Sequence, residues 1–256
     1  FCGGAGVAID LLLGHKVDSI ILNDFDVCIY SIWYAILNNT ERLLQKIYDT
    51  PINMDVWHEQ RRIYEALRAT GEYSIELAFA TFFLNRTNMS GIITGGPIGG
   101  LTQKGTYKLD CRYNKESLKK KILDIAAARK HIQLYHMDAA DFIRTVLVHQ
   151  DQERLFVFFD PPYYQQGKKL YKNAFDDEGH VALSDAIHLM NAFKWILTYD
   201  NHHRIQEIYQ DMPPMWYSLR YVANKKRDEQ ELFLHSPETI VESYDKVFFE
   251  KSPMAV

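Results

Sequence analysis

The chain has 256 residues, and 47% of them are hydrophobic, which is enough to bury the core of one domain with a smaller lobe. Its formal net charge of −4 excludes a protein that is basic over its whole surface, so a nucleic-acid partner would have to contact local basic patches. No apolar run approaches the roughly 20 residues that span a bilayer and no signal peptide is visible, which excludes a membrane-spanning protein. Cys2, Cys28 and Cys111 are odd in number and lack metal or disulfide spacing, which favours a reduced compartment, the cytoplasm.

The first predicted elements surround a glycine-rich opening, FCGGAG at residues 1–6. A helix is expected from Val7 to Leu13 with Gly14 as its C-cap, then a strand from Ser19 to Leu22, and a helix over 27–38. The chain begins inside this motif without Met, so we expect the true start of the protein upstream.

The residue at the end of the first predicted strand is acidic. Asp24 follows Gly6 at close to the roughly 20 residues that separate a nucleotide-binding glycine loop from its ribose-binding carboxylate. Glycines let a backbone approach a ligand, and a helix N-terminus offers unpaired N–H groups. The pair therefore predicts a nucleotide site, and capping of the next helix by Asp24 is the alternative.

A different pattern extends from Thr40 to about Lys130 and predicts an inserted helical lobe. Amphipathic segments over 41–48, 56–69 and 75–84 predict helices. The glycine-rich stretch from Gly91 to Arg112 predicts a mobile loop or hairpin, and a basic helix is expected from Ser117 to about Lys130. The positive charge of that helix indicates either contact with DNA or a solvated face.

Strand-like segments return after residue 131. They are expected over 132–136, 155–159 and 195–199, with a hairpin formed by 216–222 and 230–235 around a basic tip at 224–228, and a last strand over 246–250. Alternating helix-like and strand-like segments predict an α/β fold. The run LFVFF at 155–159 lacks polar alternation, which favours a strand buried on both faces in a parallel sheet.

The most specific signal directly follows that run, where Asp160-Pro161-Pro162-Tyr163 ends the predicted strand. Open α/β sheets bind ligands at the carboxyl ends of their strands. The prolines have no N–H and leave their carbonyls free to accept hydrogen bonds, and an aromatic face follows. This combination suits a flat heterocycle with an amino group, and a simple strand-ending turn is the alternative.

Several motifs in this order resemble the Dam-like (D12 class) DNA adenine-N6 methyltransferases, over essentially the whole chain. They are Phe1 to Gly6, Asn23-Asp24, Leu84-Asn85-Arg86, Met137-Asp138 and Asp160-Pro161-Pro162-Tyr163. Later in the chain, Leu170-Tyr171, Gly179-His180 and Thr198-Tyr199-Asp200 also resemble this group. The resemblance implies a Rossmann-like fold with a mostly parallel twisted sheet, helices on both faces and a C-terminal antiparallel hairpin. It assigns residues 1–39 and 131–256 to a catalytic domain and residues 40–130 to an inserted helical and target-recognition lobe.

The resemblance also assigns roles by position, with S-adenosyl-L-methionine as cofactor and double-stranded DNA as partner. The residues expected at the cofactor are Phe1, Cys2, Gly3, Gly4, Ala5, Gly6, Asp24, Phe25, Asp138, Ala139 and Asp160. The catalytic residues are expected to be Asp160, Pro161, Pro162 and Tyr163. The expected DNA-binding residues are Arg86, Asn88, Ser90, Lys104, Arg112, Lys168 and Lys169. No metal is expected. Ser90 and Thr94 depart from residues common in the family's recognition region, so no target sequence is assigned.

The residues also support a hypothesis of mechanism. The Asp160 carboxylate and the Pro161 carbonyl would each accept one hydrogen of a flipped-out adenine N6, while Tyr163 stacks on the base. An RNA or protein-amide N-methyltransferase could use a similar pocket, and a catalytically silent DNA-binding module is a further alternative. A dehydrogenase that binds NAD would share the glycine loop but would leave the Asp-Pro-Pro-Tyr motif unexplained.

Overall fold

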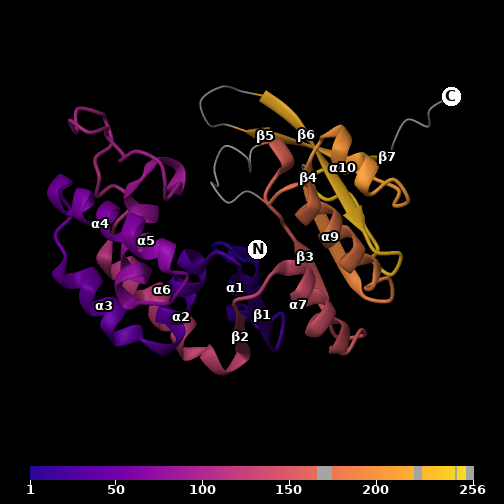
Figure 1. Ribbon diagram of the computed structural model, residues 1–256, viewed down its shortest axis with the longest axis horizontal. Helices are drawn as coiled ribbons and strands as arrows, with labels where there is room; N and C mark the ends of the chain where they lie inside the picture. The colour runs from indigo at the N-terminus through magenta and orange to yellow at the C-terminus, as the bar shows by residue number, and fades with distance from the viewer. Residues whose placement is uncertain (166–174, 222–226, 246, 252–256) are drawn as a thin grey trace. The chain divides into compact units, whose positions relative to one another are not determined.

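The computed structural model of the chain describes residues 1–165, 175–221, 227–245 and 247–251. The chain divides into two compact units (Figure 1). The N-terminal unit is Cys2–Met137, and the C-terminal unit is Phe1 together with Asp138–Val256. The predicted division into a catalytic domain and an inserted lobe comes from the family resemblance, and its boundaries differ from those of the two compact units. It stays a prediction.

The N-terminal unit is organised around helix α5 (Ile75–Thr87), which is apolar on all sides. A helix with this pattern has to be buried, and α5 packs against α2, α3 and α4. Ser74 caps its N-terminus by accepting a hydrogen bond from the Leu77 backbone N–H. The other elements of this unit are α1 (Gly6–Leu13), β1 (Ile20–Asn23), α2 (Val27–Asn38), α3 (Thr40–Asp49), α4 (Met54–Leu67), η1 (Arg68–Thr70), η2 (Met89–Gly91), α6 (Lys115–Ala127), η3 (Arg129–His131) and β2 (Ile132–Tyr135).

Most elements predicted in this part of the chain are confirmed. The helix predicted over 27–38 is α2, and α1 ends at the predicted C-cap Gly14. Strands β1 and β2 pair in parallel with Ile20 opposite Ile132, so the two segments predicted as strands form one small sheet. The stretch over 91–112 forms turns, with an antiparallel bridge between Asn88 and Pro97, as the loop or hairpin prediction expected.

The C-terminal unit contains a five-stranded sheet in the order β3-β4-β6-β5-β7 (Figure 1). Its elements are α7 (Ala139–Thr145), η4 (Leu147–His149), β3 (Phe156–Phe159), α9 (Asp177–His188), β4 (Lys194–Asp200), α10 (His203–Ile208), β5 (Met215–Tyr221), β6 (Arg227–His235) and β7 (Phe249–Lys251). The predicted C-terminal hairpin is confirmed as β5 and β6.

The expectation of a mostly parallel sheet is corrected by the strand pairing in the described residues. Only β3 and β4 run parallel in the five-stranded sheet, whereas β6 runs antiparallel to β4 and β5, and β7 antiparallel to β5. The hairpin places β6 between β4 and β5, and a strand that returns directly from its neighbour has to be antiparallel to it. The fold is therefore mixed α/β.

Strand β3 also differs from its predicted environment. Alternate side chains of a strand face opposite sides of the sheet, and on β3 the side chains of Phe156 and Phe158 are 54% and 46% exposed. Burial on both faces fits β4 better, where Trp195 and Tyr199 are fully buried on one face and Thr198 is buried on the other. Within the described residues, β3 lies at the end of the strand order and pairs with β4 alone.

Some expectations fall on residues that the structure does not describe. Lys168 and Lys169 lie outside the described residues, as do positions 224–226 of the predicted basic hairpin tip. Among the helices that are described, none combines the length and apolarity needed to cross a bilayer.

Candidate functional site

The glycine-rich opening forms a tight loop beside the end of β1. The Cys2 backbone N–H donates to the Asn23 carbonyl over 2.9 Å, which extends the strand edge into the loop. Gly3 has a φ of 46°, in the left-handed region that favours glycine. The Trp33 indole donates to the Gly3 carbonyl over 2.8 Å, so a core residue of α2 fixes this turn.

Asp24 joins this loop to the start of α2. Its carboxylate accepts hydrogen bonds from the Gly3 N–H over 2.9 Å and the Asp26 N–H over 3.0 Å, and the residue is buried. The cap of α2 is Asp26, which accepts from the Cys28 N–H, so the capping alternative for Asp24 is wrong. An ionised carboxylate has about four lone-pair sites, which leaves acceptor capacity on Asp24 for hydroxyl groups.

The loop leaves open space above its backbone. A methyl group placed on Gly3, Gly4 or Gly6 would find no other atom within 4 Å, so a ligand can approach the main chain there. Ala5, the residue before α1, is also left-handed with a φ of 43°. Burial and the nearby Asp24 carboxylate raise the pKa of the Cys2 thiol, which therefore stays protonated and is no nucleophile.

The segment after β1 is tied to the segment after β2. The Asn23 side-chain amide pairs with the Met137 backbone in both directions, each bond being 3.0 Å long. The Phe25 carbonyl lies 3.0 Å from His136 Nε2, while the Phe25 side chain is 66% exposed. The sequence placed Phe25 at the cofactor, and its ring is accessible to a ligand.

Three further expected cofactor residues lie in the C-terminal unit. Asp138 caps α7 by accepting from the backbone N–H groups of Ala140 and Asp141, and Ala139, the first residue of that helix, is buried. The Phe1 ring packs edge-on against Phe175, with 5.2 Å between ring centres. Phe1 is thus grouped with the C-terminal unit rather than with the rest of the glycine-rich loop.

Asp160 lies at the carboxyl end of β3, where the sequence placed the reactive group. The Thr198 hydroxyl donates to its Oδ1 over 3.0 Å, and the residue as a whole is exposed. Loss of water around the carboxyl group raises its pKa; the Thr198 hydrogen bond opposes this rise, and the Glu231 carboxylate adds to it. The second carboxylate oxygen, Oδ2, has no bond to Thr198.

The residues after Asp160 differ in burial and in the contacts that hold them. Pro161 is buried, Pro162 and Tyr163 are half-buried, and a helical segment begins at Tyr164. Tyr164 stacks on His202 with 4.5 Å between ring centres, and its hydroxyl donates to Asp177 over 3.0 Å. Tyr164 is therefore an anchor of the loop, which leaves Tyr163 as the aromatic candidate for base stacking.

Two expected DNA-binding residues hold each other in the N-terminal unit. Arg86 donates from Nε and Nη2 to the Arg112 carbonyl, over 3.1 and 2.9 Å. Burial and the Arg112 charge lower the pKa of Arg86. These bonds fix the end of the 91–112 stretch to α5.

Asn88 organises the start of the same stretch. Its side chain is fully buried, its Nδ2 donates to the carbonyls of Ile92, Ile93 and Gly95, and its Oδ1 accepts from the Trp57 indole. The amide is saturated by these bonds, so in this structure Asn88 builds the loop. Two other expected DNA-binding residues, Ser90 and Lys104, are exposed.

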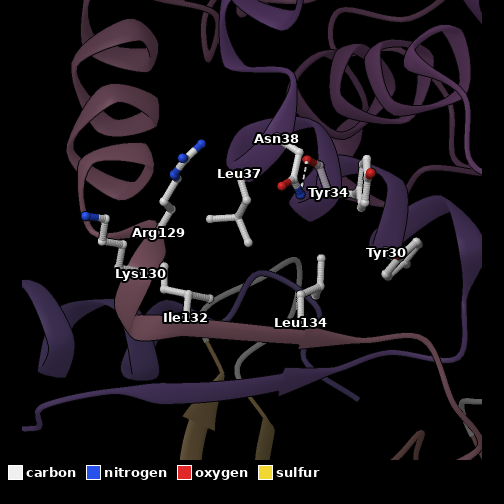
Figure 2. A pocket seen from close by; sticks show the side chains of 8 residues that line it. All are labelled: Tyr30, Tyr34, Leu37, Asn38, Arg129, Lys130, Ile132 and Leu134. Atoms are coloured by element: carbon white, nitrogen blue, oxygen red, sulfur yellow. Dashed lines mark hydrogen bonds between the residues drawn. The ribbon is translucent and has the colours of Figure 1, made fainter.

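A separate cavity of about 320 Å³ lies between α2 and β2 (Figure 2). Arg129 and Lys130 line one end, and Tyr30 and Tyr34 line the other. None of the expected catalytic or cofactor residues lines this cavity. Among the described residues, no cluster of His, Cys, Asp or Glu could hold a metal ion.

Three residues that build these sites were not predicted as site residues: Trp33, Thr198 and Asp200. Asp200 carried a signal, since it is an acidic residue directly after a buried strand. Thr198 carried a weaker one, as part of the Thr198-Tyr199-Asp200 run that resembles the family. Trp33 carried none, because a buried aromatic on a helix has an ordinary structural explanation.

Comparison with known families gives one match. The model of the D12 class N6 adenine-specific DNA methyltransferase family matches residues 1–231. A search among curated proteins finds no significant match.

Proposed function

The chain belongs to the family of D12 class N6 adenine-specific DNA methyltransferases, and we propose that it acts on an adenine flipped out of double-stranded DNA at a specific sequence. Family membership makes it an enzyme that depends on S-adenosylmethionine and favours DNA adenine over the RNA, protein-amide and dehydrogenase alternatives. The observation that carries the proposal is the exposed Asp160 at the end of β3, with one oxygen bound by Thr198. A cytoplasmic location and a Rossmann-like arrangement of the fold are part of this proposal.

Asp160 and Pro161 are the proposed acceptors for the reacting amine. S-adenosylmethionine supplies a methyl group activated on a sulfonium, with a neutral thioether as leaving group. The protein then has to align the nucleophile and stabilise developing charge. Asp160 and the Pro161 carbonyl would each accept a hydrogen bond from one N6–H, which turns the nitrogen lone pair toward the methyl group. Once the methyl group is on N6, one N6 proton is released to water. Pro162 stiffens the loop, and Tyr163 stacks on the flipped base, a contact worth about 1–3 kcal/mol.

The proposed cofactor contacts follow the motif positions. The open space above Gly3, Gly4 and Gly6 suits a ligand close to the backbone, and the residual acceptor capacity of Asp24 suits ribose hydroxyls. The remaining proposed contacts are Phe1, Cys2, Ala5, Phe25, Asp138, Ala139 and Asp160.

DNA recognition is proposed for the lobe of residues 40–130. Exposed Ser90 and Lys104 are proposed to contact DNA directly, together with Arg112. Arg86 and Asn88 support recognition by fixing the loop from which these residues project, because both donate hydrogen bonds to its backbone. Lys168 and Lys169 are proposed to contact phosphates.

The test of this function uses the complete protein with unmethylated double-stranded DNA and radiolabelled S-adenosylmethionine. After digestion to nucleosides, the label is expected in N6-methyldeoxyadenosine, and sequencing of the methylated DNA gives the target site. An RNA and a glutamine-containing peptide serve as parallel substrates. Label in either of these, with none in DNA, would overturn the proposal.

Replacing Asp24 tests the cofactor assignment. We expect Asp24→Ala to weaken binding of S-adenosylmethionine by about 10- to 100-fold, because it removes both the ribose acceptor and the support of the Gly3 turn. Titration calorimetry measures the dissociation constant. Asp26→Ala is the matched control, since it removes the cap of α2, costing about 1 kcal/mol of stability, without touching the proposed contact. Equal cofactor affinity in the two variants would contradict the role of Asp24.

A further inference from the structure

The carboxyl end of β4 lies against the Asp160–Tyr163 loop. Alternate residues of a strand share a face, and here Thr198 and Asp200 both bond to the loop, while Tyr199 between them is fully buried with its hydroxyl 2.8 Å from His180 Nδ1. One strand end therefore supplies two polar contacts to the loop that carries the reacting group.

Asp200 holds the backbone directly after the motif. Its Oδ1 accepts from the Tyr164 N–H over 2.8 Å and its Oδ2 from the Gln165 N–H over 3.0 Å. The two prolines provide no N–H, so the first backbone donors after Asp160 come from Tyr163 onward. A loop with so few donors cannot be held by a strand ladder, and the Asp200 carboxylate supplies acceptors in its place.

The Tyr164 side chain is fixed as well. Its hydroxyl donates to Asp177, which also accepts two hydrogen bonds of 2.8 Å from Arg204, through Nε and Nη2. Hydrogen bonds from Arg204 and Tyr164 hold the pKa of Asp177 below its usual range, so it stays an acceptor at neutral pH. Tyr164 is thus held at its backbone by Asp200 and at its hydroxyl by Asp177.

We propose that Thr198 and Asp200 are positioning residues for methyl transfer: Thr198 orients the Asp160 carboxylate, and Asp200 sets the position of the Pro161 carbonyl by holding Tyr164 and Gln165. The inference rests on the proposed roles of Asp160 and Pro161. With Thr198 on Oδ1, Oδ2 is the oxygen that receives the N6 hydrogen. A displacement of about 1 Å at such acceptors can cost roughly 100-fold in rate.

The first test replaces Asp200 in the complete protein. Asp200→Asn keeps the size of the side chain but turns an NH2 group toward one of the two backbone N–H donors. We expect the single-turnover rate of methylation to fall about 10- to 100-fold, with the dissociation constants for DNA and cofactor changed by less than about threefold. Glu178→Gln, an exposed carboxylate on α9, is the matched control and is expected to keep its rate.

The variants at Asp200 and Asp160 test the positioning role and the proposed function separately. A rate within threefold of the wild type for Asp200→Asn overturns the positioning role. If Asp160→Ala remains active, the proposed function itself fails. Should Asp200→Asn not fold, Tyr164→Phe, which removes the bond from the hydroxyl to Asp177, is expected to lower the rate several-fold at unchanged cofactor affinity. An unchanged rate in this variant overturns the proposal.

The second test follows the pH dependence of the single-turnover rate. Besides the loss of water, the side chains that act on the Asp160 carboxyl are Glu231 of β6, which raises its pKa, and Thr198, which lowers it. Activity needs the carboxylate, so the rate falls as pH drops through this pKa. Thr198→Val removes a bond to the charged form and is expected to move the acidic limb to higher pH, whereas Glu231→Gln moves it to lower pH. An acidic limb that stays in place in Thr198→Val overturns the role of Thr198.

Discussion

Asp160→Ala is expected to lower the rate of methyl transfer by about 1,000-fold, equivalent to about 4 kcal/mol of transition-state stabilisation. The substitution removes an acceptor for the N6 hydrogen and the negative charge that faces the developing cation. The fold should persist, because Asp160 is exposed and its carboxylate serves Thr198 through a single hydrogen bond. Thr198 can then bond to water.

Single-turnover reactions with radiolabelled cofactor, followed by digestion to nucleosides, measure this rate. Asp185→Ala is the matched control, since it removes an exposed carboxylate from α9 and should leave the rate unchanged. Asp160→Asn keeps one acceptor oxygen, so we expect an intermediate loss and no acidic limb in its pH profile. If Asp160→Ala retains its rate within several-fold of the wild type, another group receives the N6 hydrogens.

The place of Asp160 could be predicted because its signal is local. A run of apolar residues, a carboxylate and two prolines define a strand end without reference to any other part of the chain. The same holds for the bounds of α2, which its apolar pattern defines, although the cap is Asp26 and not the candidate Asp24. Burial of β3 could not be predicted in this way, since exposure of Phe156 and Phe158 depends on where the strand lies in the sheet.

The contacts that position the site are not local. Thr198 and Asp200 meet the loop from a strand that follows it in the chain after a long intervening segment, and Trp33 reaches Gly3 from the second helix. No spacing rule links such residues, because the distance along the chain is set by the length of the connecting elements. The resemblance located the motifs, whereas the tertiary structure shows which neighbours hold them.

The role of Asn88 in the recognition lobe also depends on tertiary contacts that the sequence does not reveal. The sequence assigned this residue to DNA binding, and the structure buries it. We expect Asn88→Ala to lower the free energy of unfolding by about 3 kcal/mol, because the Trp57 indole and the Ile93 carbonyl lose a buried partner. The corresponding fall in Tm is roughly 6–12 °C. Discrimination between target and non-target DNA should also weaken, since the loop that carries Ser90 and Lys104 loses its internal support.

Thermal unfolding measures the first effect, and binding to target and scrambled duplexes measures the second. Asn38→Ala is the matched control: Asn38 is exposed and makes one hydrogen bond within α2, to the Tyr34 carbonyl, so its removal should change neither quantity appreciably. A variant with lowered Tm but unchanged discrimination would mean that loop order and target recognition are independent. A variant with unchanged Tm would mean that the buried amide is replaced by water without cost, which the number of its partners argues against. A fall in both Tm and discrimination would mean that Asn88 supports target recognition indirectly, through the backbone that its side chain holds. Asp200 is proposed to support methyl transfer in the same indirect way.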